Sequence, residues 1–349
     1  MKYQNLGGTG ISVSRYCLGA MMFGAMGNRD HDECVGMIHR SIDAGINFID
    51  TADVYSQGES ETIVGKALAG GRRDDVVLAT KFYSPMGEGR NRRGGSRRWI
   101  VRAVEESLER LGTDHIDLYQ MHRFDERTAL EETLRALDDL VRSGKVRAIG
   151  SSMFPPDRIV EAQSLATQQG LTRFRCEQPW YSIFSREVER LVLPACERYG
   201  MGAIVWSPLD GGWLAGRYRK AADIQKGTRA ALTQRMVRTQ FGAEERIHQS
   251  KFSLVDELEK VAGEAGISLT HLAIGFAKEH PAVSSVIIGP RTPEQLEDLL
   301  ACADLQLDTG TLDAIDGLVP PGSNVNPLEN GMVALEALSP ERRRASGRV

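Results

Sequence analysis

The sequence lacks the features of secreted, metal-binding and membrane-spanning proteins. Its 349 residues include only five cysteines, which are far apart and form no CxxC pair, so neither a disulfide framework nor a structural zinc site is expected. No other metal site is expected. The amino-terminal residues contain no apolar segment typical of a signal peptide, and no stretch approaches the ~18 consecutive apolar residues of a membrane span. The sequence therefore predicts a soluble, cytoplasmic protein.

The chain also lacks an excess of basic charge. Its net charge of −4 provides no general attraction to nucleic acid or to an anionic membrane, so neither is expected as a partner. One local exception is the basic run of Arg90, Arg92, Arg93, Arg97 and Arg98. No aromatic residues are interleaved with it, so we interpret it as a solvated loop and helix start. Because this run follows the third predicted strand, part of it is placed to favour an anionic substrate.

What the sequence does contain is a regular alternation of short apolar runs and helix signals. This alternation predicts an α/β fold, a closed (β/α)8 TIM barrel of eight parallel strands wrapped by helices. A hydrophobic content of 41% can support the core of one such domain. The strands are expected at residues 15–19, 46–49, 76–80, 116–121, 146–149, 174–177, 202–205 and 284–288.

Four of the helices can be placed from residues that favour helix ends. Their expected first residues or caps are Ser96, Thr128, Ser185 and Thr292, and three of them are expected to end near Gly112, Gly144 and Gly200. Glu131 completes a capping box with Thr128. Pro293 follows Thr292 at the first helical position, where proline is favoured.

Three segments lie outside the strand and helix pattern. Residues 3–13 predict a β-hairpin that plugs the bottom of the barrel. Residues 210–249 form a long, weakly periodic loop after the seventh strand, which is typical of a ligand clamp. The barrel domain is expected to span residues 1–322, and residues 323–349 are expected to form a tail that is mobile in part.

Four titratable residues, Asp50, Tyr55, Lys81 and His122, lie at or just past the ends of three consecutive predicted strands. Taken singly, they fit a helix cap, a packing residue, a solvated strand end and a loop histidine. However, parallel strands of a barrel all end at one mouth, where barrel enzymes keep their sites. Their joint placement therefore predicts a catalytic site.

These four side chains can form a proton donor. A tyrosine with a pKa near ~10 needs a neighbour that stabilises its phenolate, and Lys81 can serve if Asp50 supplies the lysine with a counter-charge. His122 can hydrogen-bond a substrate oxygen and orient it. Such a site could protonate the oxyanion that forms when a hydride reaches a carbonyl carbon.

Two motifs resemble those of the aldo-keto reductase superfamily. The segment NFIDTADVY at residues 47–55, continued by ESETIVG at residues 59–65, is similar to the first signature of that superfamily. The segment SLERLGTDHIDLY at residues 107–119, followed by His122, is similar to the second. The resemblance covers about residues 2–320. It implies an NADPH-dependent oxidoreductase that reduces aldehydes or ketones to alcohols, with Asp50, Tyr55, Lys81 and His122 as the catalytic tetrad and Tyr55 as proton donor.

No strand is followed by a GxGxxG turn, which disfavours a Rossmann fold and requires the nicotinamide site to be built from barrel loops. The resemblance implies that Ser152 and Gln178 hold the carboxamide and that Trp206 stacks on the nicotinamide. It also implies that the glycine-containing loop at residues 207–218 approaches the pyrophosphate, with Arg217 as a cation.

The eighth strand leads into a second anion site. Gly289 and the amides of the helix near residue 292 can bind a phosphate, and Arg291 is placed for a 2′-phosphate, which favours NADPH over NADH. By similarity, Arg229 is expected to assist. The chain departs from many relatives at Met153 and Leu299. The complete set of expected cofactor contacts is Asp50, Ser152, Gln178, Trp206, Ser207, Pro208, Leu209, Gly211, Arg217, Arg229, Gly289, Arg291, Gln295 and Asp298.

The substrate is expected to be a small aldehyde or ketone with apolar or aromatic character. The pocket residues expected for it are Phe23, Tyr55, Tyr83, His122 and Trp180, with Met22 and Phe124 nearby. Residues 178–218 also resemble potassium-channel β subunits, so an NADPH-binding redox sensor or regulatory subunit is an alternative. Those subunits lack a histidine at the position of His122, which favours an enzyme. Non-redox sugar-phosphate chemistry is a weaker alternative, because it leaves Tyr55 and Lys81 without a role.

Overall fold

A closed barrel of eight parallel strands forms the centre of the protein. The computed structural model describes residues 1–224 and 244–327. Strand β10 pairs with both β9 and β3, which closes the sheet and confirms the predicted (β/α)8 architecture. The barrel strands are β3 (Tyr16–Gly19), β4 (Phe48–Asp50), β5 (Val77–Phe82), β6 (Ile116–Met121), β7 (Val146–Ser152), β8 (Cys176–Gln178), β9 (Gly202–Val205) and β10 (Val283–Ile288).

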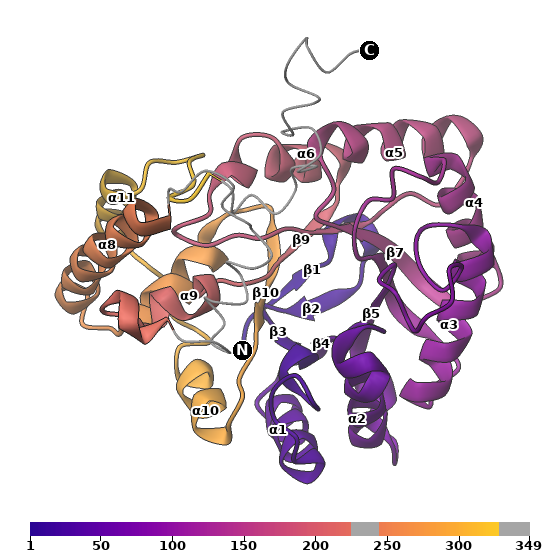
Figure 1. Cartoon of the computed structure of the whole chain (residues 1–349), viewed down its shortest axis with the longest axis horizontal. Coiled ribbons are helices and arrows are strands. Elements are labelled where there is room, and N and C mark those ends of the chain that lie inside the picture. The colour runs from indigo at the N-terminus through magenta and orange to yellow at the C-terminus, as the bar shows by residue number, and fades with distance from the viewer. Residues whose placement is uncertain (225–243, 328–349) are drawn as a thin grey trace.

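Helices surround the strands on all sides (Figure 1). The helices from α1 to α9 lie in the connections between successive parallel strands, as βαβ units require, whereas α10 and α11 follow the last strand, β10. In the described ranges, no helix is both long enough and apolar enough to cross a bilayer. The helices are α1 (His31–Asp43), α2 (Glu59–Leu68), α3 (Arg97–Leu111), α4 (Leu130–Arg142), α5 (Pro156–Gln169), α6 (Val192–Tyr199), α8 (Glu244–Glu264), α9 (Leu269–Glu279), α10 (Pro293–Ala301) and α11 (Thr309–Leu318).

Three of the predicted helix boundaries are confirmed in detail, and one of them is Gly200, which caps the carboxyl end of α6 with φ +64°. Gly112 caps the carboxyl end of α3 in the left-handed conformation, with φ +62°. Thr292 caps the amino end of α10, where its hydroxyl accepts a hydrogen bond from the Gln295 amide. Ser96 occupies the cap position of α3, although its side chain makes no capping hydrogen bond.

Two other helix starts were predicted incorrectly. The Thr128 hydroxyl bonds to the Asp125 carboxylate at 2.8 Å instead of capping a helix, so the capping box does not form and α4 begins at Leu130. Helix α6 begins at Val192 and not at Ser185. The Ser182 hydroxyl accepts the Ser185 amide and holds that segment in a turn.

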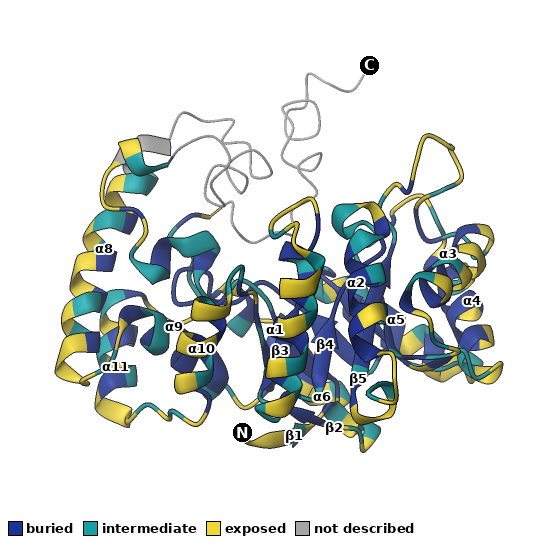
Figure 2. Ribbon diagram, turned by 90° about the horizontal axis from the view of Figure 1, so that it is seen from below, coloured by how far each residue is buried: buried dark blue, intermediate teal, exposed yellow. Residues whose placement is uncertain are grey.

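An amino-terminal hairpin of β1 (Tyr3–Asn5) and β2 (Ser12–Ser14) closes the bottom of the barrel. Figure 2 shows it below the strands, at the end where they begin. Leu6 and Val13 are fully buried and pack onto apolar residues of the barrel interior. Burial of these two side chains confirms the prediction of a plug.

The barrel interior consists of an apolar layer with a polar layer above it. The apolar layer contains Cys17, Phe48, Ala79, Leu118, Ala148, Cys176 and Ile204. Side chains in a strand alternate between the two faces of the sheet, so the residue two positions later also points inward. On five strands that next inward residue belongs to the candidate site: Asp50, Lys81, Gln120, Gln178 and Trp206.

The two segments expected to be loop and tail are described only in part. After β9, short 3-10 helices occupy Asp210–Ala215 and Ala221–Asp223, and residues 225–243 lie outside the described residues. The loop was expected to extend to residue 249, but α8 begins at Glu244, so its predicted carboxyl end was wrong. Ser323 and Val325 bond to the backbone of Arg186 and Phe184, and residues 328–349 lie outside the described part of the chain.

Candidate active site

Asp50, Lys81 and Tyr55 form a connected chain at the carboxyl ends of β4 and β5. The Lys81 ammonium donates to Asp50 Oδ2 at 2.5 Å, to the Thr51 carbonyl at 2.9 Å and to the Tyr55 hydroxyl at 3.3 Å. Asp50 and Lys81 are buried, whereas Tyr55 lies on the turn after β4 and is partly exposed. The structure therefore brings together the three residues that were expected to form the proton donor.

The charge of Lys81 is stabilised by its neighbours. Burial by itself would lower the pKa of the Lys81 ammonium, but the Asp50 carboxylate and the Tyr55 hydroxyl outweigh it and hold that pKa above its ordinary value. Lys81 therefore remains a cation at neutral pH and lies 4.9 Å from the centre of the Tyr55 ring. A fixed positive charge at this position stabilises a phenolate on Tyr55.

His122 follows β6 and completes the quartet. Its ring meets the Tyr55 ring edge to face, with 5.7 Å between centroids and an interplanar angle of 81°. Burial, the Arg123 guanidinium and the Lys81 ammonium hold the pKa of His122 well below its usual range. The imidazole is therefore neutral at pH 7 and offers one N–H donor and one acceptor nitrogen.

Gln120 is a site residue that the sequence analysis missed. Its side-chain amide donates to Asp50 Oδ1 at 3.1 Å, and the Gln178 amide donates to the same oxygen at 2.9 Å. Both oxygens of Asp50 are thus occupied, which fixes the carboxylate that holds Lys81. The available signal was a polar residue inside an apolar strand, two positions before His122 and therefore on the same face.

Unusual backbone conformations gather around the same mouth. The non-glycine residues with positive φ in the described ranges are Ser56, Gln57, Tyr83, Met153, Ser207 and Asp210. Each of them lies shortly after the end of β4, β5, β7 or β9. Such conformations cost about 1–3 kcal/mol each and persist where the surroundings enforce them, most often at functional sites. Their distribution thus supports the location of the site independently of the titratable residues.

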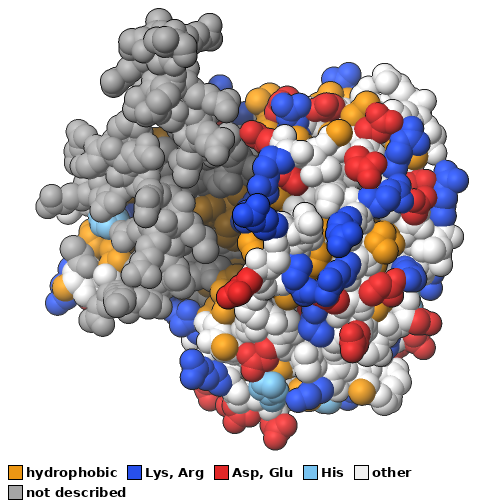
Figure 3. Space-filling view, turned by 45° about the vertical axis from the view of Figure 1, so that its right-hand side comes forward, with side chains coloured by type: hydrophobic (Ala, Val, Ile, Leu, Met, Phe, Trp, Pro, Cys, Tyr) orange, Lys and Arg blue, Asp and Glu red, His pale blue; other side chains and the backbone are white. Residues whose placement is uncertain are grey.

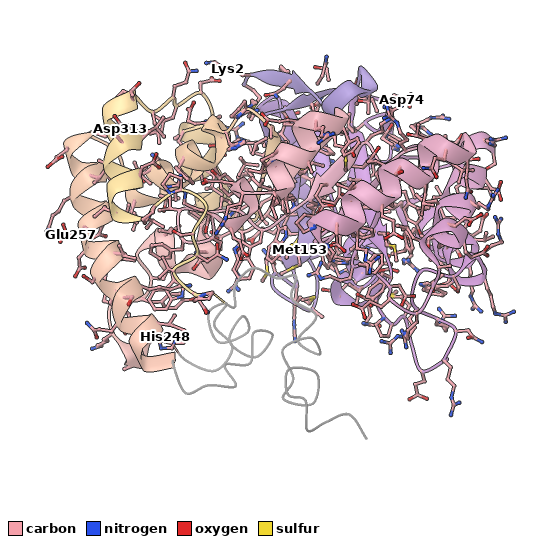
Figure 4. All side chains as sticks on the ribbon, turned by 90° about the horizontal axis from the view of Figure 1, so that it is seen from above. Lys2, Asp74, Met153, His248, Glu257 and Asp313 are labelled. Atoms are coloured by element: carbon pink, nitrogen blue, oxygen red, sulfur yellow. The ribbon has the colours of Figure 1, made fainter. Side chains whose placement is uncertain are left out.

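Three of the expected nicotinamide contacts meet at the ends of β7, β8 and β9. The Ser152 hydroxyl donates to the Gln178 carbonyl at 3.0 Å, so these two residues are adjacent. The Trp206 indole N–H lies 3.2 Å from the sulfur of Met153, and one face of its ring packs on Trp180 with 4.9 Å between centroids. Figure 4 shows Met153 at the opposite end of the barrel from Lys2. Trp206 is partly exposed and held in place by its neighbours.

The loop after β9 is anchored by a buried ion pair. Lys251 of α8 donates to Asp210 at 2.6 Å, and both side chains are only 1% exposed. Gly211 and Gly212 follow with φ values of +67° and +103°, which a residue with a Cβ rarely adopts. The Ser207 hydroxyl accepts from the Gly211 amide, and Arg217 is exposed beside Gly212.

The segment after β10 leaves donors available for an anion. The backbone amide of Arg291 donates to the Gln295 side chain, while the Arg291 guanidinium has no hydrogen bond to any described residue. A Cβ at Gly289 would meet nothing within 4 Å. By contrast, the Asp298 carboxylate lies 3.1 Å from His271. Arg229 lies outside the described residues.

The residues expected to line the substrate pocket are exposed to different degrees. Phe23 is fully buried, and Trp180 is 5% exposed. Tyr83 and Phe124 are partly exposed, and Phe124 meets Phe154 edge to face at 5.3 Å. Tyr83, Phe124 and Trp180 follow β5, β6 and β8, three strands that also carry site residues.

The basic run includes residues that are neutralised by ion pairs. Arg92 pairs with Glu106 at 2.9 Å, and Arg97 pairs with Asp139. On the face of the described residues that Figure 3 shows, Lys and Arg side chains are interspersed with Asp and Glu side chains. This mixture of charges supports the interpretation of the run as a solvated surface.

Glu177 positions the loop that carries Met153. Its carboxylate is fully buried and accepts from the Ser151 hydroxyl, from the Phe154 amide at 3.1 Å and from the Met153 amide. Burial nevertheless raises the pKa of Glu177 from 4.5 to about 7. The native state therefore holds a proton that the unfolded chain releases earlier, so stability should fall as pH rises from about 4.5 through 7.

Glu177→Gln should remove this pH dependence. A glutamine can accept hydrogen bonds from the same amides without carrying a charge. The free energy of unfolding of Glu177→Gln minus that of the natural chain should therefore rise by about 2–3 kcal/mol from pH 4.5 to pH 8. Urea unfolding across this range measures the difference. Glu197→Gln, an exposed change on α6, is the control. Parallel stability curves for the natural chain and Glu177→Gln would contradict the prediction.

Comparison with known proteins agrees with this geometry. The aldo/keto reductase family model matches residues 15–320. The uncharacterized oxidoreductase YrpG of Bacillus subtilis is 40% identical over 92% of this chain and 97% of its own length. A probable voltage-gated potassium channel subunit beta of Oryza sativa is 37% identical over 91% and 97%, and the versiconal hemiacetal acetate reductase of Aspergillus parasiticus is 35% identical over 88% and 94%. The chain belongs to the aldo/keto reductase family of oxidoreductases.

Proposed function

We propose that this chain reduces aldehydes or ketones to alcohols, with NADPH as the source of the hydride. The observation that carries the proposal is the chain from Asp50 to Lys81 to Tyr55, with distances of 2.5 and 3.3 Å. A tyrosine beside a fixed cation can give up its proton, which is what the oxygen of a carbonyl requires as the carbonyl carbon is reduced. Reduction therefore accounts for the three residues together.

Tyr55 acts as the general acid in this proposal. Its hydroxyl proton moves to the substrate oxygen, and the electron pair stays on the phenolate. Lys81 stabilises that phenolate, and Asp50 keeps Lys81 charged. Solvent then returns a proton to Tyr55, so the residue is regenerated after each turnover. The same groups can support alcohol oxidation in the reverse direction.

His122 orients the substrate. Its ring is neutral and stands edge-on to Tyr55, so its N–H can donate to the same carbonyl oxygen that Tyr55 protonates. A neutral imidazole also avoids repulsion with the Lys81 ammonium. His122 therefore contributes orientation and polarisation of the carbonyl.

The described residues fit the proposed cofactor. Trp206 offers a partly exposed ring for a nicotinamide, with Ser152 and Gln178 adjacent to it. The left-handed glycines Gly211 and Gly212 shape the loop after β9, and Arg217 is exposed beside Gly212 as a cation for a pyrophosphate. Arg291 provides a cation near the amino end of α10 for a 2′-phosphate. The remaining proposed contacts are Asp50, Ser207, Pro208, Leu209, Gly211, Arg217, Arg229, Gly289, Gln295 and Asp298.

Arg291→Ala should discriminate between the two nicotinamide nucleotides. Loss of a charged hydrogen-bond donor to the 2′-phosphate should weaken NADPH binding by about 10- to 100-fold and NADH binding much less. Quenching of tryptophan fluorescence during nucleotide titration measures both affinities. Arg147→Ala, an exposed change at the amino end of β7, is the control. An equal loss for NADPH and NADH would contradict the 2′-phosphate assignment.

A second candidate is an NADPH-binding redox sensor or regulatory subunit with little turnover. The match to proteins named as potassium channel β subunits motivates it. The two candidates predict the same nucleotide binding but different rates of reduction. His122 and its contact with Tyr55 favour the enzyme.

Nucleotide binding followed by turnover tests the proposal. The purified protein is titrated with NADPH and NADH, and aromatic and aliphatic aldehydes are then added while NADPH absorbance is followed. Tight NADPH binding with aldehyde-dependent oxidation is the expected result. Binding without turnover of any aldehyde would favour the sensor, and no nucleotide binding would contradict both candidates.

A further inference from the structure

Arg123 is a partly buried cation without a carboxylate partner in the described part of the chain. It directly follows His122, after the end of β6. Its Nη1 donates to the His122 carbonyl at 2.5 Å, and its guanidinium forms no ion pair with a described residue. The other guanidinium nitrogens donate to no described residue, and the side chain is partly exposed. Arg123 therefore retains accessible N–H donors.

Arg123 differs in this respect from partly buried arginines that have a carboxylate partner. Arg73 pairs with Asp117 at 2.8 Å, and Arg110 pairs with Glu61 at 2.7 Å. Burial without such a partner lowers the pKa of Arg123, yet a guanidinium remains protonated in proteins. An unpaired charge in this environment is unfavourable, and a bound anion would relieve the cost.

Arg123 lies next to the reacting groups. Its charge interacts with Tyr55, Tyr83 and Glu177, and it contributes to the low pKa of His122. Glu177 forms no ion pair with Arg123, and its carboxylate instead accepts hydrogen bonds from the Ser151 hydroxyl and the Phe154 amide. The remaining neighbours, Tyr55 and Tyr83, lie at the mouth where a substrate would bind.

We propose that Arg123 binds an anionic group, a carboxylate or a phosphate, on the carbonyl substrate. The inference rests on the proposed function and specifies its substrate class as short aldehydes or ketones that carry an oxyanion. A guanidinium can bind two oxygens of such a group in parallel, which fixes the orientation of the substrate as well as its charge. With the carbonyl held by Tyr55 and His122, Arg123 would set the direction of the rest of the molecule.

Matched pairs of aldehydes test this assignment. Each pair differs only in the anionic group: 4-carboxybenzaldehyde with 4-carbamoylbenzaldehyde, succinic semialdehyde with 4-oxobutanamide, and glyceraldehyde 3-phosphate with glyceraldehyde. The readout is the ratio of kcat/KM for the anionic member to that for the neutral member, at saturating NADPH. The first two pairs report on a carboxylate and the third on a phosphate.

The natural chain should prefer the anionic member of at least one pair. Arg123→Gln should lower that preference by about 10- to 100-fold, as loss of a charged hydrogen bond implies, and the change should lie mainly in KM. Arg123→Lys should retain part of the preference, because it keeps the charge but loses the planar pair of donors. Arg127→Gln removes an exposed charge from the same loop and should leave the ratio unchanged.

A binding measurement separates this inference from the proposed function. Benzoate should bind the natural chain in isothermal titration and bind Arg123→Gln at least about 10-fold more weakly. If neutral aldehydes are reduced, and the ratio of kcat/KM for the anionic member to that for the neutral member is the same in Arg123→Gln as in the natural chain, the role of Arg123 is overturned and the proposed reductase activity is not. If no aldehyde is reduced, the proposed reductase activity is wrong. The benzoate titration still tests whether Arg123 binds an anion, because it does not depend on turnover.

Discussion

Replacement of Tyr55 by phenylalanine should lower kcat for aldehyde reduction by about 100- to 10,000-fold, the range typical of a lost general acid. The substitution removes the hydroxyl that lies 3.3 Å from Lys81 and keeps the ring that contacts His122. Tyr55 is partly exposed, so the fold and nucleotide binding should be preserved. Single-turnover oxidation of bound NADPH measures the effect on the chemical step.

Tyr199→Phe provides the matched control for this substitution. Tyr199 ends α6, a helix that leads into the first residue of β9, so it lies at the other end of the barrel from Tyr55. Removal of the Tyr199 hydroxyl should leave kcat unchanged. Near-normal reduction by Tyr55→Phe would exclude Tyr55 as the proton donor and would require another acid at the mouth.

Lys81→Met should destabilise the fold and abolish reduction together. Asp50 would remain buried without its cation, and removal of one member of a buried ion pair costs about 3–5 kcal/mol. Two further donors to Asp50, from Gln120 and Gln178, reduce this cost but do not neutralise the charge. Urea unfolding measures the stability, and NADPH oxidation in the presence of aldehyde measures the activity.

The double variant Asp50→Asn with Lys81→Met tests the cause of that loss. Removal of both charges should restore part of the stability but none of the activity, because no cation then stabilises the Tyr55 phenolate. Lys260→Met, an exposed change on α8, should have little effect. A double variant no more stable than Lys81→Met would contradict the ion-pair explanation.

The site was predictable where residues carry the chemistry themselves. Asp50, Tyr55, Lys81 and His122 could be placed together because parallel strands of a closed barrel end at one mouth. Gln120 escaped notice because a glutamine has no titratable group and acts only through Asp50. Its role depends on a distance between β4 and β6, two strands separated by β5, and that distance exists only in the folded chain.

Helix ends were predictable only where the local signal had no competitor. Gly112 and Thr292 end and begin their helices as expected, since a left-handed glycine and a capping hydroxyl act on their immediate neighbours. Thr128 had the right spacing to Glu131, but its hydroxyl bonds to Asp125, which also accepts the Gly95 amide. A hydrogen bond within the loop after β6, to a carboxylate that Gly95 of the loop after β5 also holds, therefore overrode the capping preference.

The sequence by itself determined the class of fold, the order of the strands and the position of Asp50, Tyr55, Lys81 and His122 at their ends, because periodicity and the direction of side chains along a strand are local properties. Only the tertiary structure decided the environment of each group. It decided that Lys81 keeps its charge, that His122 is neutral, that Glu177 binds a proton at an unusual pH and that Arg123 has no described carboxylate partner. The physical reason is that burial and charge at one residue arise from groups on other strands, which closure of the barrel brings within a few ångströms.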